Sequence, residues 1–339
     1  MAKSLDRYSR QTLFAKIGEE GQKKLLDSYV VIIGCGALGT MIATSLTRAG
    51  VGRIRIVDRD FIEYHNLQRQ VLFDEDDIVD NLPKAIAAQN HLRKVNSDIE
   101  IEGIVADVNY TNIEELVKGA DLIMDGLDNA ETRYLINDAS LKHNIPWIYG
   151  GAIAASGATM NVIPPDPPCF RCRFPRVHSQ GSGLTCDTAG VIGPAPYIIG
   201  SLQSAEAIKI LIGSDSVSRD LVSIDVWEGT YHRFEVKPFK DCPACNGNYD
   251  FLNAKFGTRS VSLCGQNAVQ VLNTKLKQIS LMALADKLKK VGDVDYSEHM
   301  LQLNVDGNEM VVFPDGRIIV KNTNDESLAR GLYSKYIGI

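Results

Sequence analysis

The stretch VVIIGCGALG at residues 30–39 contains the glycine pattern GxGxxG, formed by Gly34, Gly36 and Gly39. An apolar run ends at the first of these glycines, and a segment with helical spacing, ALGTMIATSLTRAG, begins at Ala37. This order predicts a strand, a glycine turn and a helix. Glycine suits the turn because the backbone must approach a phosphate closely, while the helix N-terminus offers free N–H groups and a partial positive charge.

A second strand is predicted in RIRIVDRD at residues 53–60, and it ends at Asp58, nineteen positions after Gly39. A carboxylate at this position accepts hydrogen bonds from ribose hydroxyls in dinucleotide-binding folds. The pattern therefore predicts an adenosine-containing nucleotide. It does not distinguish NAD from ATP, so a dehydrogenase and an ATP-using enzyme are both open at this point.

The charge and the hydropathy of the chain exclude several classes of partner. Its 339 residues include 36 Lys and Arg against 42 Asp and Glu, a formal net charge of −6. This balance gives no broad positive field for nucleic acid or anionic lipid. The first residues, MAKSLDRYSRQ, have no apolar signal segment, and no uninterrupted apolar run approaches the roughly 18 residues of a membrane span. We expect a cytoplasmic protein with neither a nucleic acid nor a membrane as partner.

The order of the predicted elements indicates a doubly wound α/β fold with a mixed sheet. Further strands are predicted at 99–108 and 120–128, a crossover helix at 83–96, antiparallel strands within 146–165, a long helix at 196–213 and a hairpin at 221–237. The main domain is expected to cover residues 1–250. Residues 251–339 carry a separate pattern of two helices and three strands, which predicts a small α+β domain of unknown role.

Four of the seven cysteines form two CxxC pairs, Cys169 with Cys172 and Cys242 with Cys245. Two such pairs in a chain without a signal segment predict a closed tetrahedral zinc site, structural rather than catalytic. Iron–sulfur ligation is the alternative. Because the two loops contain few apolar residues, we expect the metal cross-link to replace a missing core there.

Charged and amide side chains gather where the predicted strands end. The loop DFIEYHNLQRQ at residues 60–70 concentrates donors, Lys84 lies at the head of a helix, and Asp128 and Asn129 follow another strand. Ligands bind at the carboxyl ends of the strands in open α/β sheets. The convergence of cations and carboxylates there is unusual for a nicotinamide site.

The motifs RYSRQ, GCGALG, VDRD followed by NLQRQ, PK, GLDN, the two CxxC pairs, and TCDTAGVIGP before GSLQSAEAIK occur in that order over residues 5–247. Together they resemble the MoeB/ThiF family of adenylyltransferases, relatives of ubiquitin-activating E1 enzymes. The resemblance implies a Rossmann-like E1 fold, a homodimer, and ATP with Mg²⁺ at the sheet edge. It also implies a ubiquitin-like sulfur-carrier protein whose C-terminal Gly-Gly carboxylate becomes an acyl adenylate as pyrophosphate leaves.

The sequence does not choose between a MoaD-like carrier for molybdopterin synthesis and a ThiS-like carrier for thiamine synthesis. Three other functions are kept as alternatives: adenylation of another carboxylate, an NAD-dependent oxidoreductase, and a nucleotide-binding scaffold held by zinc. Release of pyrophosphate from ATP would distinguish adenylation of another carboxylate from the oxidoreductase and the scaffold.

The resemblance also implies residue roles. The nucleotide would contact Gly34, Gly36, Ala37, Gly39, Asp58, Asp60, His65, Asn66, Leu67, Gln68, Arg69, Lys84, Asp128 and Asn129. Among these, Asp58 would bind the ribose, Arg69 and Lys84 the phosphates, and Asp128 the magnesium. No general base is required, because the attacking carboxylate is ionised near neutral pH.

Two further residues receive roles from the resemblance. Arg10 corresponds to an arginine that the partner subunit offers to the site, and Cys186 to a cysteine proposed to form a thioester or acyl disulfide with the carrier. One departure stands out. The family often has glycine two residues before Pro83, whereas this chain has Asn81, so the shape of that loop is an open question.

Overall fold

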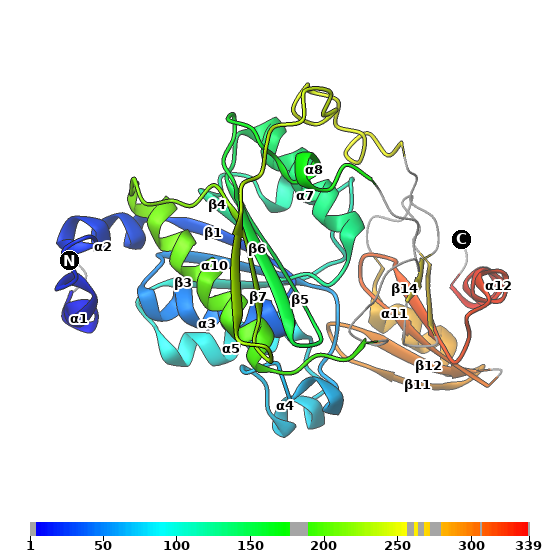
Figure 1. Cartoon of the computed structure of the whole chain (residues 1–339). Helices are drawn as coiled ribbons and strands as arrows, with labels where there is room; N and C mark the ends of the chain where they lie inside the picture. Colours follow the sequence, from blue (N-terminus) through cyan, green and yellow to red (C-terminus); the bar gives the residue numbers. More distant parts are fainter. Residues whose placement is uncertain are drawn as a thin grey trace. The chain divides into compact units, whose positions relative to one another are not determined.

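The structure is a computed structural model, and it describes residues 5–176, 189–255, 261–263, 268–271, 279–305 and 307–337. The chain divides into two compact units, Met1–Lys255 and Phe256–Ile339 (Figure 1). Each unit has its own sheet.

The first unit is built on an eight-stranded sheet with the order β3-β2-β1-β4-β5-β6-β7-β8. The first five strands in chain order pair in parallel, and the last three are added in antiparallel pairs. The mixed sheet is therefore confirmed. The strands are β1 (Tyr29–Ile33), β2 (Arg53–Asp58), β3 (Glu100–Val105), β4 (Leu122–Asp125), β5 (Trp147–Ile153), β6 (Ser156–Val162), β7 (Leu221–Asp225) and β8 (Thr230–Phe234).

Helices cover both faces of this sheet, as in other doubly wound folds. The helices described in this unit are η1 (Asp6–Tyr8), α1 (Ser9–Thr12), α2 (Gly18–Asp27), α3 (Ala37–Ala49), η2 (Tyr64–Asn66), α4 (Glu75–Val79), α5 (Lys84–Val95), α6 (Ile113–Leu116), α7 (Ala130–His143), α8 (Phe170–Arg173) and α10 (Pro194–Ile212). Side chains of α3, α5 and α10 share one core cluster, and those of α6, α7 and α8 share the other. Figure 1 shows α3, α5 and α10 together on one side of the sheet.

Strand β1 shows why the sequence produces two cores. Val30 and Ile32 pack in the cluster under α3, whereas Val31 and Ile33 pack in the cluster under α7, and none of the four is exposed. Successive strand residues point to opposite faces, so a continuous apolar run is the expected signature of a strand covered on both sides. Since β2 and β4 flank β1, the connections leave it in opposite directions, and the glycine loop after β1 lies at the switch point where ligands bind in such sheets.

The N-terminal segment is fastened to the far ends of two helices. The buried Tyr8 hydroxyl accepts a hydrogen bond from Asn96 just after α5, and Arg7 donates to the carbonyl of Val95. Gln11 donates to the carbonyl of Ala49, the last residue of α3. Residues 7–11 are therefore held at the C-terminal ends of α3 and α5, the ends opposite the glycine loop.

The second unit contains a six-stranded antiparallel sheet with the order β11-β12-β13-β14-β10-β9, and α11 and α12 supply side chains to its core. An α+β architecture is thereby confirmed. Its elements are β9 (Val261–Leu263), β10 (Ala268–Val271), α11 (Leu281–Leu288), β11 (Asp293–Tyr296), β12 (Leu301–Val305), β13 (Asn308–Val312), β14 (Ile318–Lys321) and α12 (Glu326–Tyr336). The sequence prediction missed β9, β10 and β11. Strand β11 lies at an exposed sheet edge and reads DVDY, so it lacks the apolar alternation that indicates a strand.

Candidate active site

Two of the three loop glycines are required by packing. Gly34 has φ +92°, and a Cβ there would lie 2.6 Å from the carbonyl group of Gly126, at the end of β4. A Cβ on Gly39 would lie 2.0 Å from the carbonyl oxygen of Gly34. These glycines therefore let the loop, α3 and the end of β4 pack at backbone contact, as the third glycine of such loops does in dinucleotide-binding folds.

Gly36 is different, because the space beside it is open. A Cβ on Gly36 would meet nothing closer than the Gln70 Nε2 and the Gly126 carbonyl oxygen, both at 3.9 Å. Gly36 is also the N-cap of α3, which begins at Ala37, and no side chain caps the helix. The free N–H groups and the helix dipole at this end suit an anion. The loop thus has the form of a phosphate cradle.

Asp58 lies beside this cradle and is bound to it. One of its carboxylate oxygens accepts the backbone N–H of Cys35 at 2.6 Å, and the other accepts that of Asp60 at 2.7 Å. Burial, and then the neighbouring Asp60 charge, raise the pKa of Asp58, while Lys84 and the two backbone hydrogen bonds oppose the rise. Each oxygen keeps a second lone pair for a ligand hydroxyl.

A cation and further carboxylates surround the same place. Lys84 is buried, and its ammonium lies 3.5 Å from a carboxylate oxygen of Asp60. Burial lowers the pKa of Lys84, but Asp60, Asp58 and Asp128 together outweigh burial and raise it, so the side chain is charged at neutral pH. Asp128 is exposed at the end of the β4 loop and also raises the pKa of Arg59. The structure therefore brings four residues together, Asp58, Asp60, Lys84 and Asp128. In the sequence they lie at or just beyond the ends of separate strands and helices.

The loop that follows β2 forms one wall beside Gly36. Asn66 is buried, and its side-chain oxygen accepts the backbone N–H of Glu63, closing a capping box around η2. Leu67 packs partly against the core under α3. His65 and Gln68 are exposed, and the half-buried Arg69 donates to the carbonyl of His65 at 2.7 Å. Asn66 and Leu67 thus build the loop, whereas Gln68 and Arg69 are presented at its surface.

Asn129 also has a structural task. It is the N-cap of α7, and its side-chain oxygen accepts the backbone N–H of Thr132 at 3.0 Å. Asparagine directly before a helical run is the usual sign of an N-cap, and this signal was present in the sequence. Its amide nitrogen is still available to a ligand.

The sequence reasoning missed a buried ion pair under the Asp128 loop. Arg133 donates to the carboxylate of Asp125 at 2.8 Å and to the carbonyl oxygens of Leu127 and Gly150 at 2.6 and 2.7 Å. Asp125 is fully buried and accepts the backbone N–H of Leu127. These bonds fix the segment between β4 and Asp128, so Arg133 is a positioning residue. The sequence signal for this contact was only the position of Arg133, eight residues after Asp125 in DGLDNAETR.

Asn81 resolves the open question about the loop before α5. It has φ +50°, in the left-handed region where asparagine is one of the tolerated substitutes for glycine. The backbone of Lys84 then donates to the carbonyl of Asp60. The departure from the family pattern therefore keeps a glycine-like turn.

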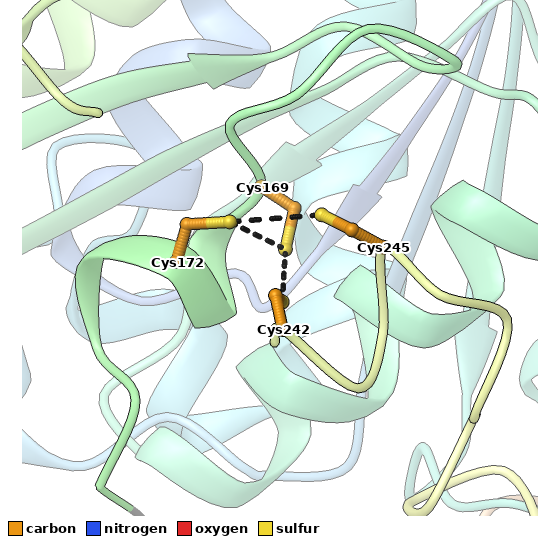
Figure 2. A group of neighbouring side chains, drawn as sticks. All are labelled: Cys169, Cys172, Cys242 and Cys245. Carbon is orange, nitrogen blue, oxygen red and sulfur yellow. Dashed lines mark hydrogen bonds between the residues drawn. The ribbon is translucent and has the colours of Figure 1, made fainter. Parts of the chain in front are cut away.

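The two CxxC pairs meet in one cluster (Figure 2). The Sγ atoms of Cys169 and Cys242, and those of Cys172 and Cys245, are 3.6 Å apart, and those of Cys169 and Cys172 are 3.9 Å apart. Zinc–sulfur bonds of about 2.3 Å in a tetrahedron give sulfur atoms about 3.8 Å apart. These three separations match those around a zinc ion, and all four sulfur atoms lie within 4.8 Å of one another.

The expectation that these loops lack a core is wrong. Phe170 and Phe251 are buried, and both pack on Tyr134 of α7, at ring centroid distances of 5.2 and 4.9 Å. Asn137 and Asp138 of the same helix accept the backbone N–H groups of these two phenylalanines, and burial raises the pKa of Asp138 to about 6. A few aromatic rings bury a large area each, so they form a core that a count of apolar residues underestimates.

We expect the purified protein to contain about one zinc ion per chain, because the four sulfurs form a closed site. Cys245→Ser, which removes one ligand, should lower the zinc content severalfold, whereas Cys35→Ser should leave it unchanged because Cys35 lies in the glycine loop. Elemental analysis of protein purified without chelator measures both. Iron in place of zinc would support the iron–sulfur alternative, and the absence of any metal would contradict a metal site.

Asp74, Asp77 and His91 form a second group of possible metal ligands, but contacts among these side chains account for their closeness. Both carboxylate oxygens of Asp77 lie 2.9 Å from His91 Nε2, and Asp77 also forms a capping box with Asp74. These contacts fasten α4 to α5.

Arg10 is not brought to the cradle of its own chain. Arg10 is exposed on α1, in the segment fastened to the far ends of α3 and α5, and it has no ion pair with any residue that the structure describes. Cys186 lies outside the described residues. Within the described ranges, no helix combines the length and the apolar character needed to span a membrane.

The fold and the site define a nucleotide-binding enzyme of the doubly wound α/β class, with a phosphate cradle flanked by a lysine and carboxylates. The sequence profile of the ThiF family matches residues 8–244. The chain belongs to the ThiF family.

Individual proteins are similar over different lengths. The chain is 42% identical over 336 residues to the Bacillus subtilis sulfur carrier protein ThiS adenylyltransferase, covering 98% of this chain and 99% of that protein. The Escherichia coli protein of the same name is 38% identical over 243 residues, covering 71% of this chain and 95% of that protein. The crystal structure of E. coli MccB with MccA-N7isoASN superposes with a TM-score of 0.63 at 26% identity, covering 73% of this chain and 75% of that one.

Proposed function

We propose that this protein is an ATP-dependent adenylyltransferase that activates the C-terminal Gly-Gly carboxylate of a ubiquitin-like sulfur carrier. The observation that carries the proposal is the phosphate cradle at Gly36 with Lys84 and Asp128 beside it. Family membership supports a nucleoside triphosphate over a nicotinamide cofactor, since two similar proteins are named ThiS adenylyltransferases.

The reaction joins the carrier carboxylate to the α-phosphorus, and the bond from that phosphorus to the bridging oxygen of the β-phosphate breaks. Pyrophosphate leaves with the bridging oxygen. One anion attacks another, so catalysis depends on screening charge rather than on a general base. Lys84 and Arg69 supply positive charge to the phosphates, and the N–H groups at the start of α3 hold one of them. Asp58 binds the ribose hydroxyls, while Asn129 offers its amide nitrogen beside the nucleotide.

Asp128 is the proposed magnesium ligand. It is an exposed carboxylate on a loop that Arg133 holds by a hydrogen bond to the carbonyl of Leu127. It also lies close enough to Lys84 to raise the pKa of that side chain. Carboxylate oxygens together with phosphates are the ligands that Mg²⁺ prefers. When bound, the ion would neutralise charge on the departing pyrophosphate.

The carrier is proposed to be of the ThiS type, which places the enzyme in thiamine synthesis. The similarity to the B. subtilis ThiS adenylyltransferase extends over both units of the chain, which supports this choice. A MoaD-type carrier for molybdopterin synthesis is the alternative outcome of the experiment below.

The site is proposed to be completed in a homodimer, with Arg10 supplied by the partner subunit. Leu13 and Phe14 follow Arg10 and are 72% and 58% exposed, which is unusual for neighbouring large apolar residues and supports a covered surface. We keep the covalent role of Cys186 toward the carrier as part of the proposal. The proposal also includes a zinc ion held by the four cysteines. It further includes a cytoplasmic location, where thiols stay reduced.

The proposal predicts exchange of labelled pyrophosphate into ATP when the protein is mixed with magnesium and a carrier that ends in Gly-Gly. Exchange should be lost when the last glycine of the carrier is deleted, because the shortened carboxylate no longer reaches the roughly 3 Å approach that the attack needs. ThiS and MoaD proteins tested side by side identify the carrier. Tight NADH binding together with no exchange for any carrier would contradict the proposal.

A further inference from the structure

The side chain of Gln70 faces the phosphate cradle and forms no hydrogen bond with any residue that the structure describes. Gln70 is 3% exposed, and its Oε1 is buried without a hydrogen-bond partner in the described part of the chain. Its Nε2 lies 3.9 Å from the position of a Cβ on Gly36 and has no acceptor among the described residues. In two other buried glutamines the Nε2 atom has an acceptor, because Gln22 donates to the carbonyl of Ala49 and Gln203 to that of Asp125.

The backbone, not the amide, holds Gln70 in place. Its N–H donates to the carbonyl of Asn66, and its carbonyl accepts the N–H of Phe73. These two backbone bonds fix the loop on both sides of Gln70, while its side-chain amide has no partner within the described ranges. A buried polar group without a hydrogen bond destabilises the free protein, and such groups in native structures call for an explanation.

A bound phosphate would explain why the amide of Gln70 has no hydrogen-bond partner among the described residues. Gly36 caps the 13-residue helix α3 without any side-chain cap, so an anion is expected where Gln70 Nε2 points. A phosphate oxygen accepts hydrogen bonds, and an amide N–H is a suitable donor. The Lys84 ammonium adds charge to the same place but makes no bond to Gln70.

We propose that Gln70 is a further nucleotide-binding residue, whose amide N–H donates to a phosphate oxygen seated at Gly36. This inference rests on the proposed function only in that the ligand is a nucleotide. It adds a neutral donor to a site otherwise built from backbone N–H groups and charged side chains.

Gln70→Met tests the inference because methionine keeps the shape of the side chain and removes both polar atoms. The melting temperature of the free protein should stay the same or rise, since an unpaired polar group is removed. The affinity for Mg-ATP should fall by on the order of tenfold, the effect of one hydrogen bond to a charged group. The affinity for adenosine, which has no phosphate, should not change. Calorimetric titration and thermal unfolding measure these quantities.

Gln22→Met is the matched control, because Gln22 is equally buried but hydrogen-bonded at the far end of α3. It should lower the melting temperature and leave the ATP affinity unchanged. Gln70→Glu should weaken Mg-ATP by a larger factor than Gln70→Met, since a carboxylate would face the phosphate.

The inference is overturned if Gln70→Met binds Mg-ATP as the unaltered protein does, or if it loses stability and affinity together as a structural residue would. Equal losses for ATP and adenosine would also overturn it. If the unaltered protein binds Mg-ATP but exchanges no pyrophosphate with any carrier, the proposed function fails while the Gln70 comparison still decides this inference. If it binds no adenine nucleotide at all, both fail.

Discussion

Asp128→Ala is expected to lower carrier-dependent pyrophosphate exchange by on the order of 10³-fold, the scale of a lost charge-stabilising group in a transition state. The side chain is exposed, so its removal leaves no cavity and no buried partner unpaired. Asp58→Ala should act differently. Ribose contacts are made equally in the ground and transition states, so it should mainly weaken ATP binding.

Two further variants test whether Asp128 acts through magnesium. Asp128→Asn keeps one ligand oxygen and loses the charge, so half-maximal exchange should require severalfold more Mg²⁺. Glu115→Ala removes an equal charge from α6, which lies before the start of β4 rather than after its end, and Glu115 forms an exposed ion pair with Lys118. It should leave exchange and the Mg²⁺ requirement unchanged. Near-normal exchange by Asp128→Ala would refute the metal-binding role.

The parts of this site that could be predicted from the sequence are those whose signal is local. The GxGxxG pattern predicts both the loop and the helix after it, because the glycines follow directly on an apolar run and helical spacing begins among them. Lys84 and Asp128 were placed by the same reasoning, since each follows a recognisable strand or helix boundary. The cysteine cluster was also predictable, because the spacing of CxxC positions two thiols for one ion.

The parts that could not be predicted depend on partners that are remote in sequence or on a choice between two uses of one side chain. Asn66 and Asn129 are amides suited both to a ligand and to a helix N-terminus, and the structure uses Asn66 in a capping box and Asn129 as an N-cap. The bond from Arg133 to Gly150 joins α7 to β5 and exists only once the sheet has formed. The orphaned amide of Gln70 is likewise visible only when its surroundings are complete.

The location of Arg10 leads to a second prediction of a large loss of pyrophosphate exchange. Helix α5 has 12 residues and is about 18 Å long. Lys84 begins α5 at the cradle, whereas Arg7 and Tyr8 are fastened at its other end. Arg10 is thus about one helix length from the cradle of its own chain, well beyond the reach of its side chain. If it acts in catalysis, it must act in the site of a partner subunit.

Arg10→Ala should therefore lower exchange by about 10²-fold or more, the scale of one lost transition-state donor, while the ATP affinity changes less. Lys16→Ala, which removes an exposed cation from the same segment, should have little effect.

Mixing the two inactive proteins, Arg10→Ala and Asp128→Ala, gives the decisive result. In a hybrid dimer with twofold symmetry, one site contains the intact Asp128 of one chain and the intact Arg10 of the other, while the second site lacks both. Random exchange makes half of the dimers hybrid, and each hybrid has one working site, so about a quarter of the full rate should return. A site complete within one chain would regain nothing, because every chain in the mixture carries one of the two substitutions. Subunit exchange verified by mass spectrometry, with no recovery of exchange activity, would rule out the shared site.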